Sequence, residues 1–406
     1  MVRRIKNIGH WLLAVFATLI YGFPAGKLTV IGITGTDGKT STTYLLYHLL
    51  KKAKLPVSMI STVKAVIGSQ IYDTGFHVTT PSAFFLQKLL KKAKSEGSRF
   101  LVLETTSHAL DQFRTLGTSI DIAVITNISH EHLDYHGNLE KYLEAKAKIL
   151  KGVKTAILNR DDASFNTLKK KVKGKTITFS LDKTADYTPR SVDLPESEPA
   201  FQKANMLAAV AAAREAGVDL KTAEKALRTF SGVPGRMERV KNGHGINVII
   251  DFAHKINALK EALAFARTQT RNKLIVVFGT AGLRDRLKRP IMGELAAKAA
   301  DFAVLTAEDP RTEDVRNIIA QIAKGCLNAG MQEKNKNFGG NNLQRKNKYF
   351  FRIPDRQEAI NFAIRKLAKK GDTVIVCGKG HEKSMCYGKI EYPWDEKQAV
   401  LKALDF

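Results

Sequence analysis

Short apolar runs alternate along this chain with stretches in which leucines recur at helical spacing. The run at residues 27–33 is rich in β-branched residues, and leucines spaced along one helix face follow it at residues 45–50, after a glycine-containing turn. Further apolar runs at residues 100–103 and 122–126 each precede a polar loop and a helical stretch. The pattern predicts a parallel sheet wrapped by helices, with functional loops at the carboxyl ends of its strands.

The same alternation resumes in the second half of the chain and predicts a second, Rossmann-like α/β unit. Its expected strands are at residues 246–251, 274–279, 302–306 and 373–377. Between the halves, an alanine-rich helix at residues 204–213 leads to Ser231-Gly-Val-Pro-Gly235, which has the composition of a hinge. We therefore predict an N-terminal helix over residues 1–26, a central domain over 27–232 and a C-terminal domain over 233–406. Residues 176–198 form a polar, proline-containing stretch, and residues 332–348 are expected to form a surface loop insertion.

The N-terminal segment combines charge with apolar residues. Arg3, Arg4 and Lys6 precede an apolar stretch at residues 11–23, as in a signal peptide, but the stretch is short for a membrane span and lacks a small-residue cleavage site. We expect a helix that either packs on the protein or lies on a membrane surface.

Composition narrows the class of protein. A chain of 406 residues has room for two or three domains, and 44% hydrophobic with 26% charged residues indicates a folded globular protein. The formal charge of +26 attracts anions such as nucleotides, nucleic acid or acidic lipid. No zinc-finger or RNA-binding signature supports nucleic acid, and three cysteines without metal-ligand spacing suit a reducing cytoplasm.

The segment Gly32-Ile-Thr-Gly-Thr-Asp-Gly-Lys-Thr40 has the chemistry of a phosphate-binding loop. Backbone amides, the positive end of a helix and Lys39 can together cradle a polyphosphate, and Thr40 can ligate magnesium. The strict Walker pattern would place glycine at Ile33. The preceding strand and following helix nevertheless favour a nucleotide site over an ordinary turn.

From Gly35 to Thr40 the loop resembles the Gly-Thr-Asn-Gly-Lys-Thr loop of the Mur ligase family, with Asp37 in place of the usual Asn. Further blocks resemble that family, in the expected order, over nearly all of residues 28–406. The resemblance implies a P-loop ATPase domain followed by an amino-acid-binding domain. It also implies an ATP-dependent ligase that joins a carboxylate to an amine through an acyl phosphate. The branch it resembles adds meso-diaminopimelate to UDP-N-acetylmuramoyl-L-Ala-D-Glu in peptidoglycan synthesis, in the cytoplasm.

The family organises Mg²⁺ with a Glu, a His and a carbamylated Lys. Glu104, the stretch Glu131-His-Leu-Asp-Tyr-His-Gly137 and Lys146 match these elements. The implied metal ligands are Thr40, Glu104, His132 and carbamylated Lys146, and the implied catalytic residues are Lys39, Glu104, His132, Lys146 and Arg236. A protonated lysine repels a cation, whereas its carbamate offers two oxygens. We expect neither Lys39 nor Glu104 to be a core residue.

The resemblance also assigns binding residues. The implied ATP contacts are Gly35, Thr36, Asp37, Gly38, Lys39, Thr40, Ser41, Asn205, Arg236, Asp251 and His254. The implied substrate contacts are Thr79, Thr80, Thr106 and Arg114 for the muramoyl peptide, and Arg284, Asp309, Arg311, Gly378 and Glu382 for the amino acid. Arg311 suits the distal carboxylate of diaminopimelate and Glu382 its distal ammonium. Asp309 replaces the Asn of the family's usual Asp-Asn-Pro-Arg.

The resemblance does not extend to the family's N-terminal uridine-binding domain, so the identity of the acceptor stays open. The oligomeric state also stays open. Lys255-Ile-Asn257 and Leu283 also depart from the family pattern. Two alternatives follow: a ligase of the same superfamily with another acceptor, or a catalytically silent scaffold on a membrane surface. The intact set of Lys39, Thr40, Glu104, His132 and Lys146 argues against a silent protein.

Overall fold

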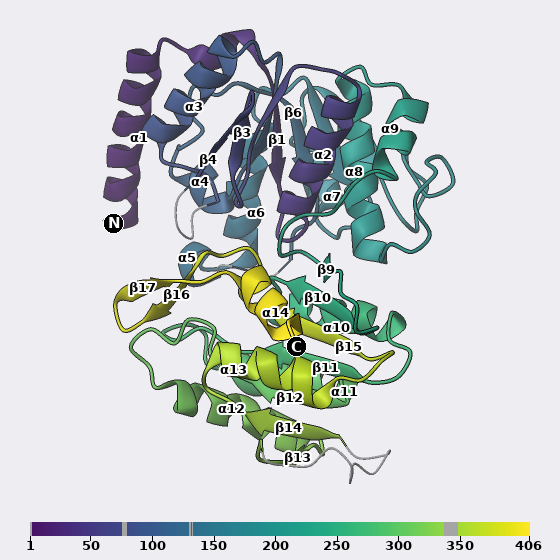
Figure 1. The fold of residues 1–406 in the computed structure, drawn as a ribbon. Helices are drawn as coiled ribbons and strands as arrows, with labels where there is room; N and C mark the ends of the chain where they lie inside the picture. Colours follow the sequence, from purple (N-terminus) through teal and green to yellow (C-terminus); the bar gives the residue numbers. More distant parts are fainter. Residues whose placement is uncertain (1, 75–78, 130, 132, 337–347) are drawn as a thin grey trace. The chain divides into compact units, whose positions relative to one another are not determined.

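The computed structural model describes residues 2–74, 79–129, 131, 133–336 and 348–406. The chain forms two compact units, Met1–Ser231 and Gly232–Phe406, so the division falls within the segment predicted as a hinge. Each unit has a largely parallel sheet covered by helices (Figure 1), which confirms the predicted α/β class.

The first unit contains an eight-stranded sheet in the order β4-β3-β2-β5-β1-β6-β7-β8. The neighbouring strands β2, β5, β1, β6, β7 and β8 all pair in parallel. Strand β3 pairs antiparallel with β2, and β4 pairs antiparallel with β3. Its strands are β1 (Thr29–Thr34), β2 (Val57–Ile60), β3 (Ala65–Ile67), β4 (Gln70–Tyr72), β5 (Phe100–Glu104), β6 (Ile120–Ile125), β7 (Thr155–Asn159) and β8 (Lys175–Phe179). The carboxyl ends of β5, β1 and β6 are therefore neighbours.

Helices cover both faces of this sheet. One buried hydrophobic cluster joins α2, α8 and α9 to the sheet. A second cluster joins α3 to the sheet, and a third joins α4 and α6 to it. The helices of this unit are α1 (Val2–Tyr21), α2 (Lys39–Lys52), α3 (Ala83–Ser95), α4 (Ser107–Asp111), α5 (Leu133–His136), α6 (Leu139–Ala147), α7 (Phe165–Lys169), α8 (Ala200–Glu215) and α9 (Leu220–Leu227), with short 3₁₀ turns at Pro24–Lys27 and Lys148–Leu150.

The second unit contains a seven-stranded sheet in the order β13-β14-β12-β11-β15-β10-β9, in which only β9 is antiparallel. Helices α10, α11 and α12 share one core cluster, and α13, η4 and α14 share the other. The elements are β9 (Glu238–Val240), β10 (Asn247–Asp251), α10 (Ile256–Thr268), β11 (Leu274–Phe278), α11 (Lys288–Ala299), β12 (Phe302–Leu305), α12 (Val315–Asn328), β13 (Gln332–Glu333), β14 (Tyr349–Arg352), α13 (Arg356–Asn361), η4 (Phe362–Leu367), β15 (Thr373–Cys377), the hairpin β16 (Ser384–Tyr387) and β17 (Ile390–Pro393), and α14 (Glu396–Leu404).

Strand β8 lies at the start of the polar stretch at residues 176–198, where the sequence did not indicate a strand. Ile177 and Phe179 are buried, whereas Thr176 and Thr178 are only half-buried, a two-residue alternation that the polar composition obscured. Within residues 332–348, β13 pairs with β14, and residues 337–347 lie outside the described part of the chain.

Candidate functional site

The phosphate loop connects β1 to α2, and close contacts at two positions require glycine. A Cβ at Gly35 would lie 1.8 Å from Thr126 Oγ1, and one at Gly38 would lie 2.2 Å from Asn205 Oδ1. Gly38 also has a φ of 79°, in the left-handed region. The helix then begins at Lys39, followed by buried Thr40 and half-buried Ser41.

Residues at the end of β6 fix the loop's backbone. The Asp37 amide donates to Asn127 Oδ1 over 2.9 Å, and the Asp37 carbonyl accepts from Thr126 Oγ1 over 2.6 Å. The Thr36 amide donates to the Asn127 carbonyl over 2.8 Å. Thr126 and Asn127 were missed by sequence reasoning, although their place after a buried run beside β1 was a usable signal.

Lys39 folds back over this loop. Its Nζ donates to the carbonyls of Gly35 and Thr36, each over 3.0 Å. Both hydrogen bonds hold the ammonium at the phosphate loop, where a positive charge favours the binding of an anionic phosphate.

Glu104, at the carboxyl end of β5, bonds to the loop's threonine. Its Oε1 accepts from Thr40 Oγ1 and Thr62 Oγ1, each over 2.8 Å, and its Oε2 accepts from the Thr62 amide over 2.8 Å. The Glu104 residue is 1% exposed, so the expectation that it lies outside the core is wrong. Three hydrogen bonds compensate its burial, and Thr62 is a further residue that sequence reasoning missed.

This oxygen donor set fits a magnesium ion. One carboxylate and one threonine hydroxyl suit Mg²⁺ when nucleotide phosphates and water complete the octahedron. No group of three or more His, Cys, Asp or Glu side chains in the described residues could by itself hold a metal. His132, the third implied ligand, lies outside the described residues.

Lys146, on α6, lies beneath the phosphate loop. Its Nζ donates to the Gly35 carbonyl over 2.5 Å and lies 3.5 Å from Thr34 Oγ1 and 4.7 Å from the centre of the Tyr142 ring. The residue is 1% exposed. A buried amine beside a phosphate loop is unlike the solvated helix lysine that its sequence position alone would indicate.

The residues expected to hold the acceptor form one network with Glu104. Thr80 Oγ1 donates to the Glu104 carbonyl over 3.2 Å and accepts from the Thr106 amide over 3.1 Å. Arg114 Nη1 donates to the Thr80 carbonyl over 2.9 Å, and Thr106 caps α4. Burial lowers the pKa of Arg114. Half-buried Thr79 precedes this network.

The remaining residues expected to bind ATP divide between the two units. Asn205 is buried on α8, where its Oδ1 accepts from Thr42 Oγ1 over 3.4 Å. In the second unit, Arg236 and His254 both contact Phe252. The Arg236 guanidinium lies 4.4 Å from the centre of the Phe252 ring, and His254 Nδ1 lies 2.8 Å from the Phe252 carbonyl oxygen. Asp251 accepts from the Met237 and Ala253 amides, and burial raises its pKa.

A fully buried ammonium organises the region expected to bind the amino acid. Lys379 Nζ donates to Asp309 Oδ1 over 2.9 Å and to Glu382 Oε2 over 2.6 Å. Burial opposes its charge, but Glu382 and Asp309 raise the pKa of Lys379 overall. Sequence reasoning missed Lys379, although a lysine between Gly378 and Gly380 directly after a buried strand was a signal.

The two arginines expected in this region differ in their surroundings. Arg311 has a φ of 55° and is joined to the β16–β17 hairpin, because its amide donates to the Cys386 carbonyl over 3.0 Å. Its Nη1 lies 3.4 Å from the Gly282 carbonyl. Arg284 is exposed on the loop that follows Gly282. The backbone therefore holds Arg311 in place, and Arg284 projects into solvent.

Glu308 was also missed. It is 6% exposed, and its Oε2 is buried without a hydrogen-bond partner among the described residues. Burial raises the pKa of Glu308 to about 7, although Lys288 and Lys379 oppose this shift. The Glu308 side chain packs closely on Gly378, because a Cβ at that position would lie only 3.3 Å from the Glu308 side chain.

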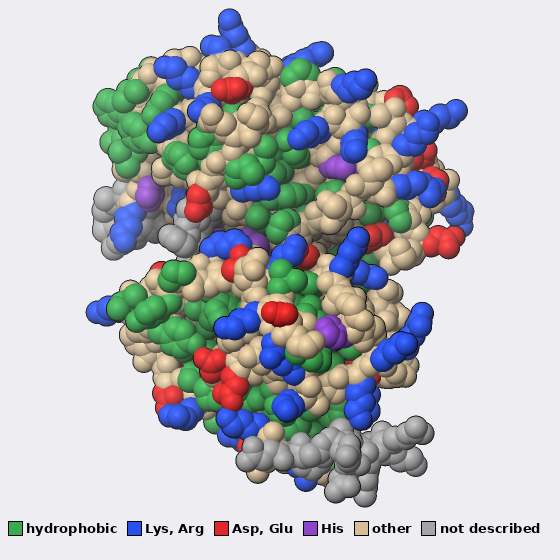
Figure 2. All heavy atoms as spheres, in the orientation of Figure 1, with side chains coloured by type: hydrophobic (Ala, Val, Ile, Leu, Met, Phe, Trp, Pro, Cys, Tyr) green, Lys and Arg blue, Asp and Glu red, His purple; other side chains and the backbone are tan. Residues whose placement is uncertain are grey.

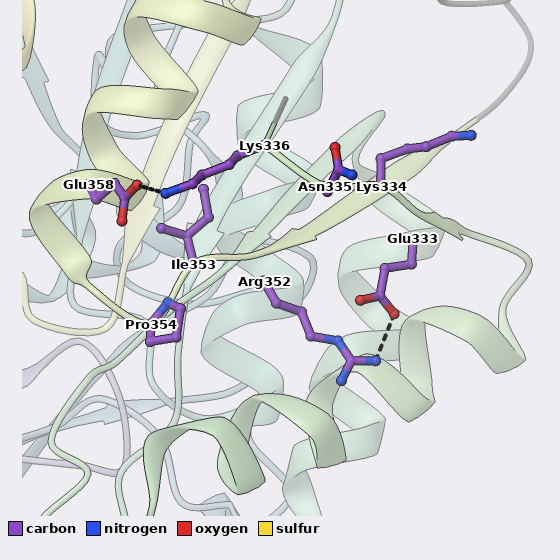
Figure 3. Close-up of a pocket in the computed structure, with 8 residues that line it drawn as sticks. All are labelled: Glu333, Lys334, Asn335, Lys336, Arg352, Ile353, Pro354 and Glu358. Atoms are coloured by element: carbon purple, nitrogen blue, oxygen red, sulfur yellow. Dashed lines mark hydrogen bonds and ion pairs between the residues drawn. The ribbon is translucent and has the colours of Figure 1, made fainter. Parts of the chain in front are cut away.

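A separate pocket of about 300 Å³ lies beside β13 and β14. Both acidic residues of the pocket are paired with basic ones, Glu358 with Lys336 and Glu333 with Arg352, as Figure 3 shows. Because these charges are already satisfied, we do not place the functional site there.

Comparisons with known proteins agree over both units. A Mur ligase middle domain model matches residues 33–207, and a Mur ligase, glutamate ligase domain model matches residues 235–380. The UDP-N-acetylmuramoyl-L-alanyl-D-glutamate--2,6-diaminopimelate ligase of Geobacillus thermodenitrificans is 35% identical, over 96% of this chain and 81% of that protein. A UDP-N-acetylmuramyl-tripeptide synthetase of Roseiflexus sp. is also 35% identical, over 97% and 81%. A solved structure of a ligase with the first of these names has a TM-score of 0.63 at 32% identity, over 93% of this chain and 78% of that one.

Proposed function

Because this chain belongs to the Mur ligase family, we propose that it adds 2,6-diaminopimelate to UDP-N-acetylmuramoyl-L-alanyl-D-glutamate. As a member of that family it is an ATP-dependent ligase that forms an amide bond and releases ADP. The observation that carries the proposal is the position of Glu104, whose carboxylate meets Thr40 of the phosphate loop and whose carbonyl meets Thr80 of the acceptor network. The carboxyl end of β5 thus connects the residues assigned to phosphate binding with those assigned to acceptor binding.

In the first half-reaction, an acceptor carboxylate oxygen attacks the γ-phosphorus and ADP leaves. Lys39 turns from the loop carbonyls to the phosphate oxygens, and the loop amides bind their charge. Thr40 and Glu104 would hold Mg²⁺, which when bound supplies positive charge beside the transferring phosphoryl group. Thr106 and Arg114 position the acceptor, and Arg236 adds positive charge.

In the second half-reaction, the amine nitrogen attacks the carbonyl carbon of the acyl phosphate, and phosphate leaves with the carbon–oxygen bond electrons. The nitrogen loses one proton, which the departing phosphate accepts. We assign the binding of the amino acid to Arg311, Glu382 and Asp309. Arg311 offers a planar fork to a carboxylate. Glu382 accepts from Lys379 through Oε2 and offers an anion for the distal ammonium.

We further propose that Lys146 is carbamylated. Its neutral amine attacks carbon dioxide, one proton is released, and the product carries a negative charge. The support is the position of Lys146, buried beneath the loop at Gly35, where a negative group would balance Mg²⁺ and a second ammonium would oppose it.

We also propose peripheral contact with the cytoplasmic face of a membrane through α1. The support is the outward-facing apolar surface of that helix.

One assay tests the ligase proposal. The purified chain is incubated with ATP, Mg²⁺, UDP-N-acetylmuramoyl-L-alanyl-D-glutamate and single amino acids, and both ADP release and product mass are measured. We expect ADP release that requires both the acceptor and diaminopimelate, with one amide product. ADP release with diaminopimelate but a different acceptor would leave the amino-acid assignment standing and overturn the acceptor.

A further inference from the structure

Helix α1 is attached to the first unit by its small side chains. Ala14, Ala17 and Thr18 face inward, where α1 packs on α3 and the Ala14–Ala17 pair meets Phe113 and Leu116. Thr18 Oγ1 lies 3.2 Å from the Leu116 carbonyl, and a Cβ at Gly117 would lie 2.4 Å from the Thr18 methyl group. The contact is close and specific, so the orientation of the helix about its own axis is fixed.

The large apolar side chains of α1 point the other way. Ile8, Leu12, Leu13, Phe16, Leu19 and Ile20 are each between 46% and 65% exposed. From Ile8 to Phe23, every exposed position is apolar or glycine. Figure 2 shows hydrophobic side chains gathered along the upper left edge, where α1 runs in Figure 1. A contiguous apolar surface of this kind marks an interaction site.

The charged side chains of α1 and of its neighbour α3 have one sign. The chain contains no Asp or Glu before Asp37, and Lys6 is exposed at the beginning of α1. The neighbouring α3 contains no acidic residue, and its Lys88, Lys91 and Lys94 are exposed. An apolar strip bordered by lysines complements a surface that is apolar inside and anionic outside.

We infer that α1 lies in the interface of an anionic lipid bilayer, with its large side chains at the acyl boundary and the lysines of α1 and α3 at the headgroup phosphates. No described helix is both long and apolar enough to cross a membrane, which agrees with a helix that lies in the membrane plane. A second copy of the chain is a poorer occupant, because a symmetric contact would bring like-charged lysines together. The inference specifies the membrane contact proposed above and does not depend on the ligase chemistry.

The full chain is mixed with sucrose-loaded vesicles of phosphatidylcholine alone, or of phosphatidylcholine and phosphatidylglycerol in equal parts, and sedimented. We expect binding to the anionic vesicles, weakened by salt. Leu12→Glu/Phe16→Glu should weaken it by about tenfold or more. Ile71→Glu/Leu327→Glu, which adds the same charge at exposed apolar positions elsewhere, should leave it unchanged.

Lys88→Glu/Lys91→Glu provides a second test at exposed positions, and should also weaken binding to the anionic vesicles. ADP release should be unchanged in all these variants, which separates this inference from the ligase proposal. Equal binding by wild type and Leu12→Glu/Phe16→Glu would overturn the inference. So would equal binding to both vesicle types, or a wild-type dimer that Leu12→Glu/Phe16→Glu dissociates, since the face would then bind a second copy.

Discussion

Lys379 Nζ lies 2.9 Å from Asp309 Oδ1, and both residues are buried. Asp309 stands where the family usually has Asn, so the extra negative charge is balanced by a lysine within the protein. Removing that lysine would take away the cation that pairs with buried Asp309 and with half-buried Glu382. We expect Lys379→Met to lower the free energy of unfolding by about 3–5 kcal/mol.

Asp309→Asn should cost much less, because an amide oxygen can still accept from Lys379 and from the Cys386 amide. Urea unfolding of the two variants checks this. A smaller loss for Lys379→Met than for Asp309→Asn would show that the pair does not balance charge as described.

The catalytic assignment predicts that Lys39→Ala and Glu104→Gln reduce ADP release by about a hundredfold or more, because each removes charge that acts on the phosphoryl group. Glu104→Gln keeps the shape of the side chain and tests its charge alone. The matched control is Glu294→Gln, on the exposed surface of α11. Near wild-type turnover in Lys39→Ala, in a chain that melts normally, would remove this assignment.

Carbamylation predicts that Lys146→Ala is inactive and that a small carboxylate such as acetate partly restores ADP release, because it can supply the missing anion. Mass spectrometry with labelled bicarbonate, after chemical trapping of the carbamate, should find the label on Lys146. An unmodified Lys146 in a crystal grown with bicarbonate and nucleotide would contradict the proposal.

Specificity for the amino acid should reside in Arg311. Lysine lacks the distal carboxylate and would leave the guanidinium opposite an empty position, so we expect diaminopimelate to be preferred by about a hundredfold or more. Arg311→Leu should remove most of this preference, whereas Arg284→Leu should have a smaller effect because Arg284 is exposed. Competition between the two amino acids, with product masses counted, measures the ratio. Equal use of both by the wild-type chain would overturn the diaminopimelate assignment while leaving the ligase activity intact.

Glu308 predicts how stability depends on pH. Burial raises the pKa of Glu308 to about 7 in the folded chain from its ordinary value of 4.5, so the folded state binds more protons than the unfolded state between these pH values. The contribution of Glu308 to the free energy of unfolding is therefore fully present below pH 4.5, the ordinary pKa. It is lost as pH rises through the folded-state pKa of about 7, which lowers the free energy of unfolding by about 3 kcal/mol.

Glu308→Gln should remove that loss and be the more stable form at pH 8. Urea unfolding of both forms at pH 5 and pH 8 gives the difference directly, because the other titrating groups are common to both. An equal pH dependence in the two forms would show that Glu308 is not the group responsible.

The sequence predicted β1, β5, β6, β10, β11, β12 and β15 because they are largely apolar runs, buried on both faces as at β5 and β15. It did not predict β8, whose buried Ile177 and Phe179 alternate with polar residues in a polar segment. In the site, the residues of the phosphate loop could be named because backbone geometry restricts their type, as at Gly38.

The partners of those residues could not be named. Thr62, Asn127 and Lys379 act through contacts between segments far apart in the chain, such as the 70 positions that separate Lys379 from Asp309. A local pattern can place Asn127 and Lys379 directly after buried strands, but it does not identify the distant residues that they contact. Glu308 illustrates the same limit, because only the folded structure reveals that its carboxylate is buried without a partner.

The hydrogen bond between Thr18 and Leu116 spans 98 positions of the chain. During synthesis, α1 therefore leaves the ribosome long before the segment that covers its inner face exists. At about 5–20 residues per second, the delay is roughly 5–20 seconds. Throughout that interval α1 lacks its contact with Leu116 and Gly117, so the helix of a nascent chain has time to meet a lipid surface or a chaperone before that contact can form.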